Sequence, residues 1–304
     1  GRTFRASAAM ATSGDGGSAR PRTAEDEEFE EADVILAELR RRAATGECDL
    51  PWGDTKERRE APDGALLVER TYALGGSEDP GRPVLTLLEM PYSAHPDVSV
   101  GVNGTGGIVW PGALGLVNLL RQRFDELLGA AAAAAPVLAL EIGAGCGLPG
   151  LCLAVLLGAT SGTSGTPSAA EGLHRVVLTD EAEAVLANLR RNVEANVAQL
   201  GSCRAEVARL EWGELLEGEA APPAEAVDVL LGSDVIWGHR GELVGRLARR
   251  LVRPGGLLLI SAQEGREGLD VFEAALRCPE QEGGEGPAFG IEVTQAHEAG
   301  ESLV

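Results

Sequence analysis

The sequence predicts an α/β protein whose central sheet is open and carries helices on both faces. Apolar runs of strand length alternate with amphipathic helical patterns along most of the chain. A glycine-rich stretch joins one of these runs to a helix, and acidic residues or tryptophans follow several of the other runs. Ligands of such sheets bind outside the carboxyl ends of the strands. We therefore expect the functional site where these residues meet.

The length and composition of the chain limit its domain organisation and its partners. The 304 residues suffice for one large domain with appendages, and 26 Lys and Arg against 47 Asp and Glu give a net charge of −21. This acidity argues against a nucleic-acid partner and fits a basic protein partner, although it also serves solubility. The sequence has no apolar run of about 18 residues, so we expect no membrane partner.

The cysteines point to a reducing compartment. Their number is odd, five, and they form no C-x-x-C pair, so neither a disulfide framework nor a zinc site is indicated. We therefore expect a cytoplasmic protein. The alternative is an organelle, because residues 1 to 23 are rich in Ser, Ala, Gly, Thr and Arg and resemble the end of a transit peptide. A GC-rich genome also produces such a composition.

Three parts are expected along the chain. Residues 1–24 read as a disordered or targeting tail, residues 25–103 as an extension, and residues 104–304 as the main domain. The extension begins with a helix over 25–45, which is acidic first and basic last, as the helix dipole favours. Two strands follow, at 64–74 and 83–90, and the turn-rich residues between them predict a β-hairpin.

The main domain begins with a glycine loop and a helix over 111–128, which has Pro111 in its first turn. Trp110 stands at the mouth of this helix, as a core plug or as a platform for a ligand. The next apolar run ends at Glu141, which predicts a carboxylate beside whatever occupies the following turn. A ligand with hydroxyl or amino donors is implied.

That turn contains glycines at 143, 145, 147 and 150. Glycine lets the backbone reverse sharply and approach a ligand closely, so the stretch predicts a strand, a binding turn and a helix. The pattern Gly145-x-Gly147-x-x-Gly150 also satisfies the dinucleotide fingerprint. The turn by itself therefore leaves the cofactor open.

Beyond a small-residue insert at 158–172, a second strand over 175–180 ends at Asp180. Without the insert, Asp180 has the spacing expected of an acid that binds ribose hydroxyls. A helix over 181–200 carries Asn188, Asn192 and Asn196 at regular spacing. Strands are expected at 204–210, 227–233 and 257–262, with a helix at 241–252, and Trp212 and Asp234 follow two of these strands.

Taken together, these motifs resemble the family-16 seven-β-strand S-adenosylmethionine-dependent methyltransferases, the group that includes the methyltransferase-like 21 type protein-lysine methyltransferases. The resemblance covers roughly residues 104–276. It is carried by Trp110-Pro111, Glu141-Ile-Gly-Ala-Gly-Cys-Gly-Leu-Pro-Gly, Thr179-Asp180, Asn192 and Asn196, Leu210-Glu-Trp-Gly213, and Ser233-Asp-Val-Ile-Trp237. It implies a Rossmann-like seven-stranded sheet with helices on both faces.

The resemblance also implies a set of site residues for the cofactor S-adenosyl-L-methionine. Gly143, Ala144 and Gly145 would line its methionine part, Asp180 would hold the ribose, and Trp212 would lie against the adenine. Trp110 would stand beside the cofactor, and Glu141 and Ser233 would complete the site.

The same resemblance implies catalytic roles for Asp234, at the entry of the substrate amine, and for Trp237. Most members of the family carry Tyr at the latter position; an indole keeps a π-face for a cation but lacks the hydroxyl. The family also closes its sheet with an antiparallel strand pair. Here residues 291–294 read as a single strand, so we expect an irregular or absent seventh strand.

The expected activity is methylation of a protein lysine by direct in-line transfer, with no metal. A small molecule or a histidine is an alternative acceptor. A nicotinamide-dependent oxidoreductase fits the glycine fingerprint but not Glu141 or the single Lys56. A non-catalytic acidic binding module fits the net charge but not a complete site. The sequence gives no oligomeric state.

Overall fold

The structure is a computed structural model. It describes residues 55–60, 66–74, 83–90, 105–160, 173–218, 226–238, 240–263, 265–277 and 289. Several expected features lie outside these residues: the tail, the helix at 25–45, most of the insert, and the strand at 291–294. The described residues contain two sheets, one antiparallel and one parallel, so the α/β class is confirmed.

The smaller sheet has the order β1-β2-β3 and lies in the extension. Strands β2 (Leu66–Ala73) and β3 (Val84–Glu89) pair antiparallel and form the predicted hairpin. Strand β1 (Thr55–Glu60) pairs with β2 as a third strand, which the sequence did not predict. The sequence of β1, Thr-Lys-Glu-Arg-Arg-Glu, has no apolar alternation and therefore gave no strand signal.

The main sheet has the order β6-β5-β4-β7-β8, and all its pairs are parallel. Its strands are β4 (Leu138–Glu141), β5 (Arg175–Asp180), β6 (Arg204–Arg209), β7 (Val227–Ser233) and β8 (Val252–Ser261). Strand β8 begins five residues before the expected 257, since the residues Arg253-Pro-Gly-Gly belong to it. The described residues supply five strands to this sheet, so its seven-stranded form stays a prediction.

Helices connect these strands. They are α2 (Pro111–Phe124), continued by the π-helical η3 (Asp125–Gly129) and α3 (Ala130–Ala134), α4 (Leu148–Thr160), α5 (Glu183–Asn196), α6 (Trp212–Glu217), α7 (Arg240–Leu251) and α8 (Leu269–Arg277). Short 3₁₀ turns stand at η2 (Thr105–Gly107) and η5 (Val197–Gln199). The sequence reading missed α6 and α8.

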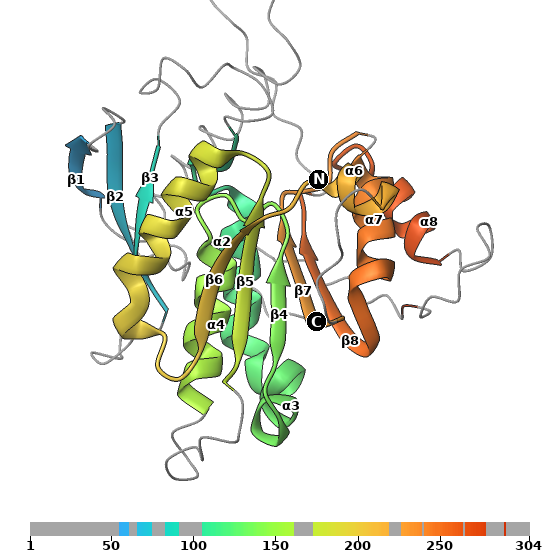
Figure 1. Ribbon diagram of the computed structural model, residues 1–304, viewed down its shortest axis with the longest axis horizontal. Coiled ribbons are helices and arrows are strands. Elements are labelled where there is room, and N and C mark those ends of the chain that lie inside the picture. The colour runs from blue at the N-terminus through green and yellow to red at the C-terminus, as the bar shows by residue number, and fades with distance from the viewer. Residues whose placement is uncertain are drawn as a thin grey trace, which may run out of the picture.

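The alternation of side chains along the strands divides the core into two parts. In β4, Ala139 packs into a cluster with α2 and α4, whereas Leu140 packs into a second cluster with α7 and α8. The parallel sheet is thus covered from both sides, as expected for buried apolar strands. Figure 1 shows the smaller sheet at one side of the molecule, with β3 beside α5.

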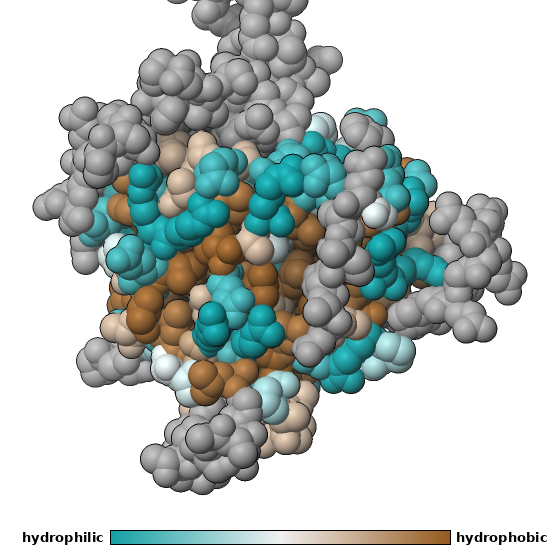
Figure 2. Space-filling view, in the orientation of Figure 1, coloured by the Kyte–Doolittle hydropathy of each residue, from teal (hydrophilic) through white to brown (hydrophobic). Residues whose placement is uncertain are grey.

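Hydrophobic residues occupy the middle of the face that Figure 2 shows, over the strands drawn in Figure 1 between α5 and α7. Hydrophilic residues dominate above this band. None of the helices in the described part of the chain combines the length and the apolar character that crossing a bilayer requires.

Candidate functional site

The glycine loop after β4 forms the floor of the site. Gly143 and Gly145 have φ angles of +56° and +53°, which side chains of other residues rarely adopt. A Cβ at Gly145 would lie 3.2 Å from the carbonyl oxygen of Gly106, so the loop approaches η2 closely. The loop closes on itself through a 2.7 Å bond from Gly147 N–H to Ala144 O. These positions explain the glycines that the sequence shows.

A cavity of about 330 Å³ lies above this loop at the carboxyl ends of the strands. Nine of the ten residues predicted from the sequence line it: Trp110, Gly143, Ala144, Gly145, Asp180, Trp212, Ser233, Asp234 and Trp237. They come from five separate segments of the chain. Its volume lies within the range of about 300 to 1,000 Å³ that is usual for small-ligand sites.

Asp180 stands at the end of β5, where its carboxylate accepts three backbone hydrogen bonds. Oδ2 accepts from Gly145 N–H at 3.2 Å, and Oδ1 accepts from the N–H groups of Glu181 and Ala182 at 2.9 and 3.3 Å. Burial raises the pKa of this carboxyl, and the three donors counteract part of the rise. Asp180 thus ties the second strand end to the glycine loop and faces the cavity.

Glu141 is the one predicted residue that does not line the cavity, and the expectation of a carboxylate beside the ligand is corrected here. Its side chain is fully buried behind the loop, where Oε2 accepts from Gly150 N–H at 3.0 Å. Its Oε1 has no hydrogen-bond partner. Burial raises the pKa of Glu141 to about 8, so the group holds a proton at neutral pH.

Three tryptophans surround the cavity. Trp110 is the N-cap residue of α2, and Trp212 begins α6. The guanidinium of Arg240 lies 5.4 Å from the ring centroid of Trp212 and 4.5 Å from that of Trp237. The sequence suggested that a π-face of Trp237 could receive a cation. In the structure, the guanidinium of Arg240 lies over this ring.

Asp234 and Ser233 follow β7. Asp234 has a φ of +52°, and its Oδ2 accepts from Gly112 N–H at 2.6 Å in the first turn of α2. Negative charge is favourable at that end of a helix. A side chain at Gly112 would collide with this carboxylate, which explains the glycine. Ser261 Oγ donates to Gly112 O at 2.7 Å, so two strand ends fix the start of α2 beside the cavity.

The sequence reading missed several residues of the cavity wall. Gly106, Val185 and Arg240 line it with the predicted set, and so does Arg266. Gly106 could have been found from the glycine run that precedes α2. The arginines gave no such signal, because an arginine near a helix start is usually on the surface. Among the described residues, no group of three or more His, Cys, Asp or Glu could hold a metal ion.

The chain is similar to known proteins over the part that contains this cavity. A family model described as lysine methyltransferase matches residues 98–272, which is more than half of the chain. The mouse protein N-lysine methyltransferase METTL21A is 36% identical over 134 residues, which are 44% of this chain and 49% of that protein. The alignment with this curated relative therefore spans about half of the relative's length.

Solved methyltransferases are similar over part of the chain. An O-methyltransferase from Bacillus cereus in complex with SAH is 21% identical, with a TM-score of 0.34, over 51% of this chain and 67% of its own. TrmN from Thermus thermophilus is 23% identical, with a TM-score of 0.32, over 49% of this chain and 39% of its own. These likenesses are too partial to bear on function.

Proposed function

The chain belongs to the lysine methyltransferase family, and on this premise we propose that it transfers a methyl group from S-adenosylmethionine to a lysine side chain of a protein. The observation that carries the proposal is the meeting of the glycine loop, Asp180 and Trp212 in one cavity. These residues are distant in sequence. They come together only because β4, β5 and β6 are neighbours in the sheet.

The wall of the cavity fits this cofactor. Asp180 offers carboxylate oxygens, the acceptors that ribose hydroxyls require. Trp212 supplies an aromatic surface for a flat base, and the loop from Gly143 to Gly145 lets a ligand approach the backbone. When bound, S-adenosylmethionine supplies an activated methyl group on a sulfonium.

The apolar part of the cavity wall suits a lysine acceptor. A lysine of ordinary pKa, about 10.4, must lose its proton at a cost of roughly 4 to 5 kcal/mol near neutral pH. The apolar part of the cavity wall, with Ile108, Val109 and Leu243, provides a partly dry surrounding that favours the neutral amine. Asp234 holds the start of α2 and thereby Trp110; its direct role toward the amine stays a prediction.

The substrate is, in this proposal, a protein with a basic surface around its target lysine. The net charge of −21 supports such a partner through electrostatic complementarity. A nucleic-acid substrate is disfavoured by the same charge. We place the protein in the cytoplasm, with an organelle as the alternative because of the composition of residues 1–23.

Transfer of labelled methyl tests the proposal. The protein is incubated with S-adenosylmethionine labelled in the methyl group and a cell lysate, with Asp180→Ala as the control variant. We expect a discrete labelled protein that the variant does not label, and methyl-lysine in its hydrolysate. Label in methyl-histidine or only in small molecules would overturn the lysine assignment. Absence of label together with absence of S-adenosylhomocysteine binding would overturn the whole proposal.

A further inference from the structure

Helix α5 pairs with the free edge of strand β3 through asparagine side chains. Asn196 Oδ1 accepts from Thr86 N–H at 2.8 Å, and its Nδ2 donates to Thr86 O at 2.7 Å. Asn192 repeats this pairing at Leu88, with bonds of 2.8 and 3.2 Å. Four residues of a helix rise about 6 Å and two residues of a strand about 6.6 Å, so the two repeats match. The asparagines replace a neighbouring strand.

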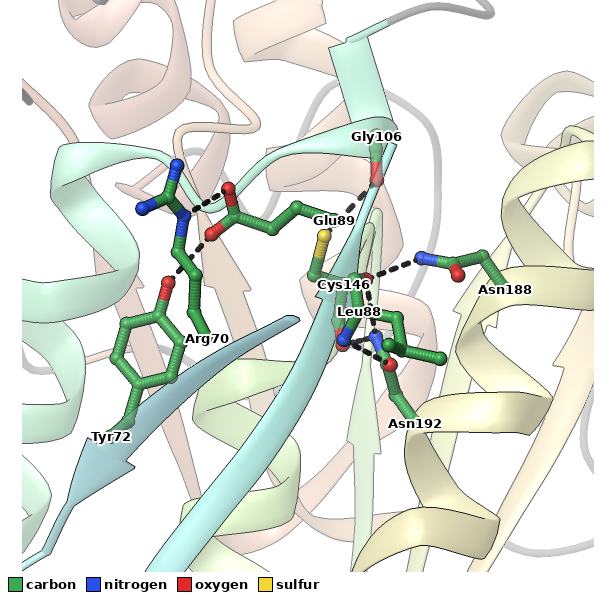
Figure 3. A network of polar contacts seen from close by, with 8 residues as sticks. All are labelled: Arg70, Tyr72, Leu88, Glu89, Gly106, Cys146, Asn188 and Asn192. Atoms are coloured by element: carbon green, nitrogen blue, oxygen red, sulfur yellow. Dashed lines mark hydrogen bonds and ion pairs between the residues drawn. The ribbon is translucent and has the colours of Figure 1, made fainter. Parts of the chain in front are cut away.

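Asn192 differs from Asn196 in one contact. Its Nδ2 also donates to the carbonyl oxygen of Cys146 at 2.9 Å, in the glycine loop that floors the cavity (Figure 3). Asn192 is fully buried, so water does not compete for this bond. The corresponding extra bond of Asn196 goes to Asn192 O, within α5 itself. Only Asn192 of this pair joins β3 to the loop.

The carbonyl of Cys146 lies outside the hydrogen-bond ladder of α4. That ladder begins with Leu151 N–H donating to Gly147 O. The N–H of Gly150, which could have turned back to Cys146, donates to Glu141 instead. A buried carbonyl without a donor is costly. Asn192 supplies this donor, and its orientation is determined because Oδ1 must face Leu88 N–H.

The end of β3 is a firm support for such a contact. The carboxylate of Glu89 is buried and accepts from Arg70 Nε at 2.7 Å and from Tyr72 Oη at 2.6 Å, both on β2 (Figure 3). Met90 N–H then donates to Gly107 O at 2.7 Å in η2. Residues 88 to 90 are therefore held on several sides, and Asn192 links them to the loop.

We propose that Asn192 is a positioning residue for the cofactor, which holds the loop from Gly143 to Gly147 against β3 through the Cys146 carbonyl. The inference rests on the proposed function. Among the residues that the structure describes with their side chains, none of β2 or β3 lines the cavity. The antiparallel sheet nevertheless belongs to the cofactor site, because it fixes the backbone on which the ligand lies.

The test compares Asn192→Leu with the matched variant Asn196→Leu. Both lose one rung of the pairing with β3, but only the first leaves Cys146 O without its donor. By calorimetry with S-adenosylhomocysteine, we expect affinity to fall about three- to tenfold for Asn192→Leu and to stay within about twofold for Asn196→Leu. The pair Asn192→Asp and Asn196→Asp, which keeps side-chain size and the acceptor oxygen, gives the same contrast if the leucine variants do not fold.

A second measurement uses the unmodified protein. Binding and loop order are reciprocally linked, so saturating S-adenosylhomocysteine should slow hydrogen exchange of the Leu88 amide more than that of Thr86. Equal affinities of the Asn192 and Asn196 variants, or equal protection of the two amides, would overturn the inference and leave the proposed function intact. Failure of the unmodified protein to bind the ligand would overturn both.

Discussion

Glu141 and Asp180 are acidic residues at the carboxyl ends of adjacent strands, but only Asp180 faces the cavity. Both accept hydrogen bonds from the backbone of the glycine segment, Glu141 from Gly150 and Asp180 from Gly145. Glu141 is enclosed behind the loop, protonated, with one unpartnered oxygen. Asp180 faces the cavity and accepts three N–H bonds. A strand end therefore does not make an acid a ligand-binding residue. Its position along the strand decides, because Glu141 is level with Leu178 and Asp180 lies two residues further along β5, at the cavity.

The largest expected effect is the loss of cofactor binding in Asp180→Ala. This variant removes the acceptors that we propose for the ribose and frees the Gly145 amide, so we expect affinity for S-adenosylhomocysteine to fall about 10- to 100-fold. Asp180→Asn keeps one acceptor oxygen and should lose less. Calorimetry measures both, and an affinity unchanged in Asp180→Ala would contradict the role assigned to this residue.

Behind the loop, substitution should affect stability more than binding. Glu141→Ala leaves a cavity and a buried Gly150 N–H without its acceptor, which we expect to cost about 2 to 4 kcal/mol of unfolding free energy. Glu141→Gln resembles the protonated acid and should cost under about 1 kcal/mol. Urea denaturation at pH 7 tests the pair. An equal loss in both variants would mean that the ionised form is needed.

The pH dependence of the unfolding free energy tests whether Glu141 is protonated in the folded protein. Burial raises the pKa of Glu141 to about 8 from its ordinary value of 4.5, so the folded protein keeps a proton that the unfolded chain releases. The contribution of protonated Glu141 to the unfolding free energy is fully present below pH 4.5 and is lost as pH rises toward 8. In Glu141→Gln the unfolding free energy should therefore depend less on pH between these values. Parallel curves for the two proteins would contradict the buried, protonated state.

A smaller effect is expected from Arg240, whose positive charge offsets part of the rise that burial causes in the pKa of the Asp180 carboxyl. In Arg240→Gln that pKa should rise, so the loss of cofactor affinity on acidification should begin at a higher pH. Affinities measured between pH 5 and 8 reveal the shift. A profile identical to that of the unmodified protein would show that the guanidinium near Trp212 and Trp237 does not act on Asp180.

Much of this site could be predicted because an apolar run that stops at a polar residue marks the end of a strand. The apolar runs before Glu141, Asp180 and Ser233 gave β4, β5 and β7, and parallel neighbours bring their ends together. The side on which Glu141 lies was also encoded. It shares the parity of Ala139, which packs toward α2 and α4, whereas Leu140 packs toward α7 and α8. Asp180 shares the parity of Leu178 in the same cluster, so this pattern alone did not separate the two acids.

Other features could not be predicted from one sequence. The regular spacing of Asn188, Asn192 and Asn196 is visible, but their partners in β3 lie about 100 residues away along the chain. The charged strand β1 has no apolar pattern, and Arg240 meets Trp212 only through the packing of α6 on α7. Contacts of this kind depend on tertiary structure rather than on local periodicity.

A crystal structure of the protein with S-adenosylhomocysteine would test the central claim most directly. We expect the ligand in the cavity above the glycine loop, with ribose hydroxyls on Asp180, the base against Trp212, and no contact with Glu141. A ligand bound elsewhere, or one that displaces the loop to reach the Glu141 carboxyl, would contradict it.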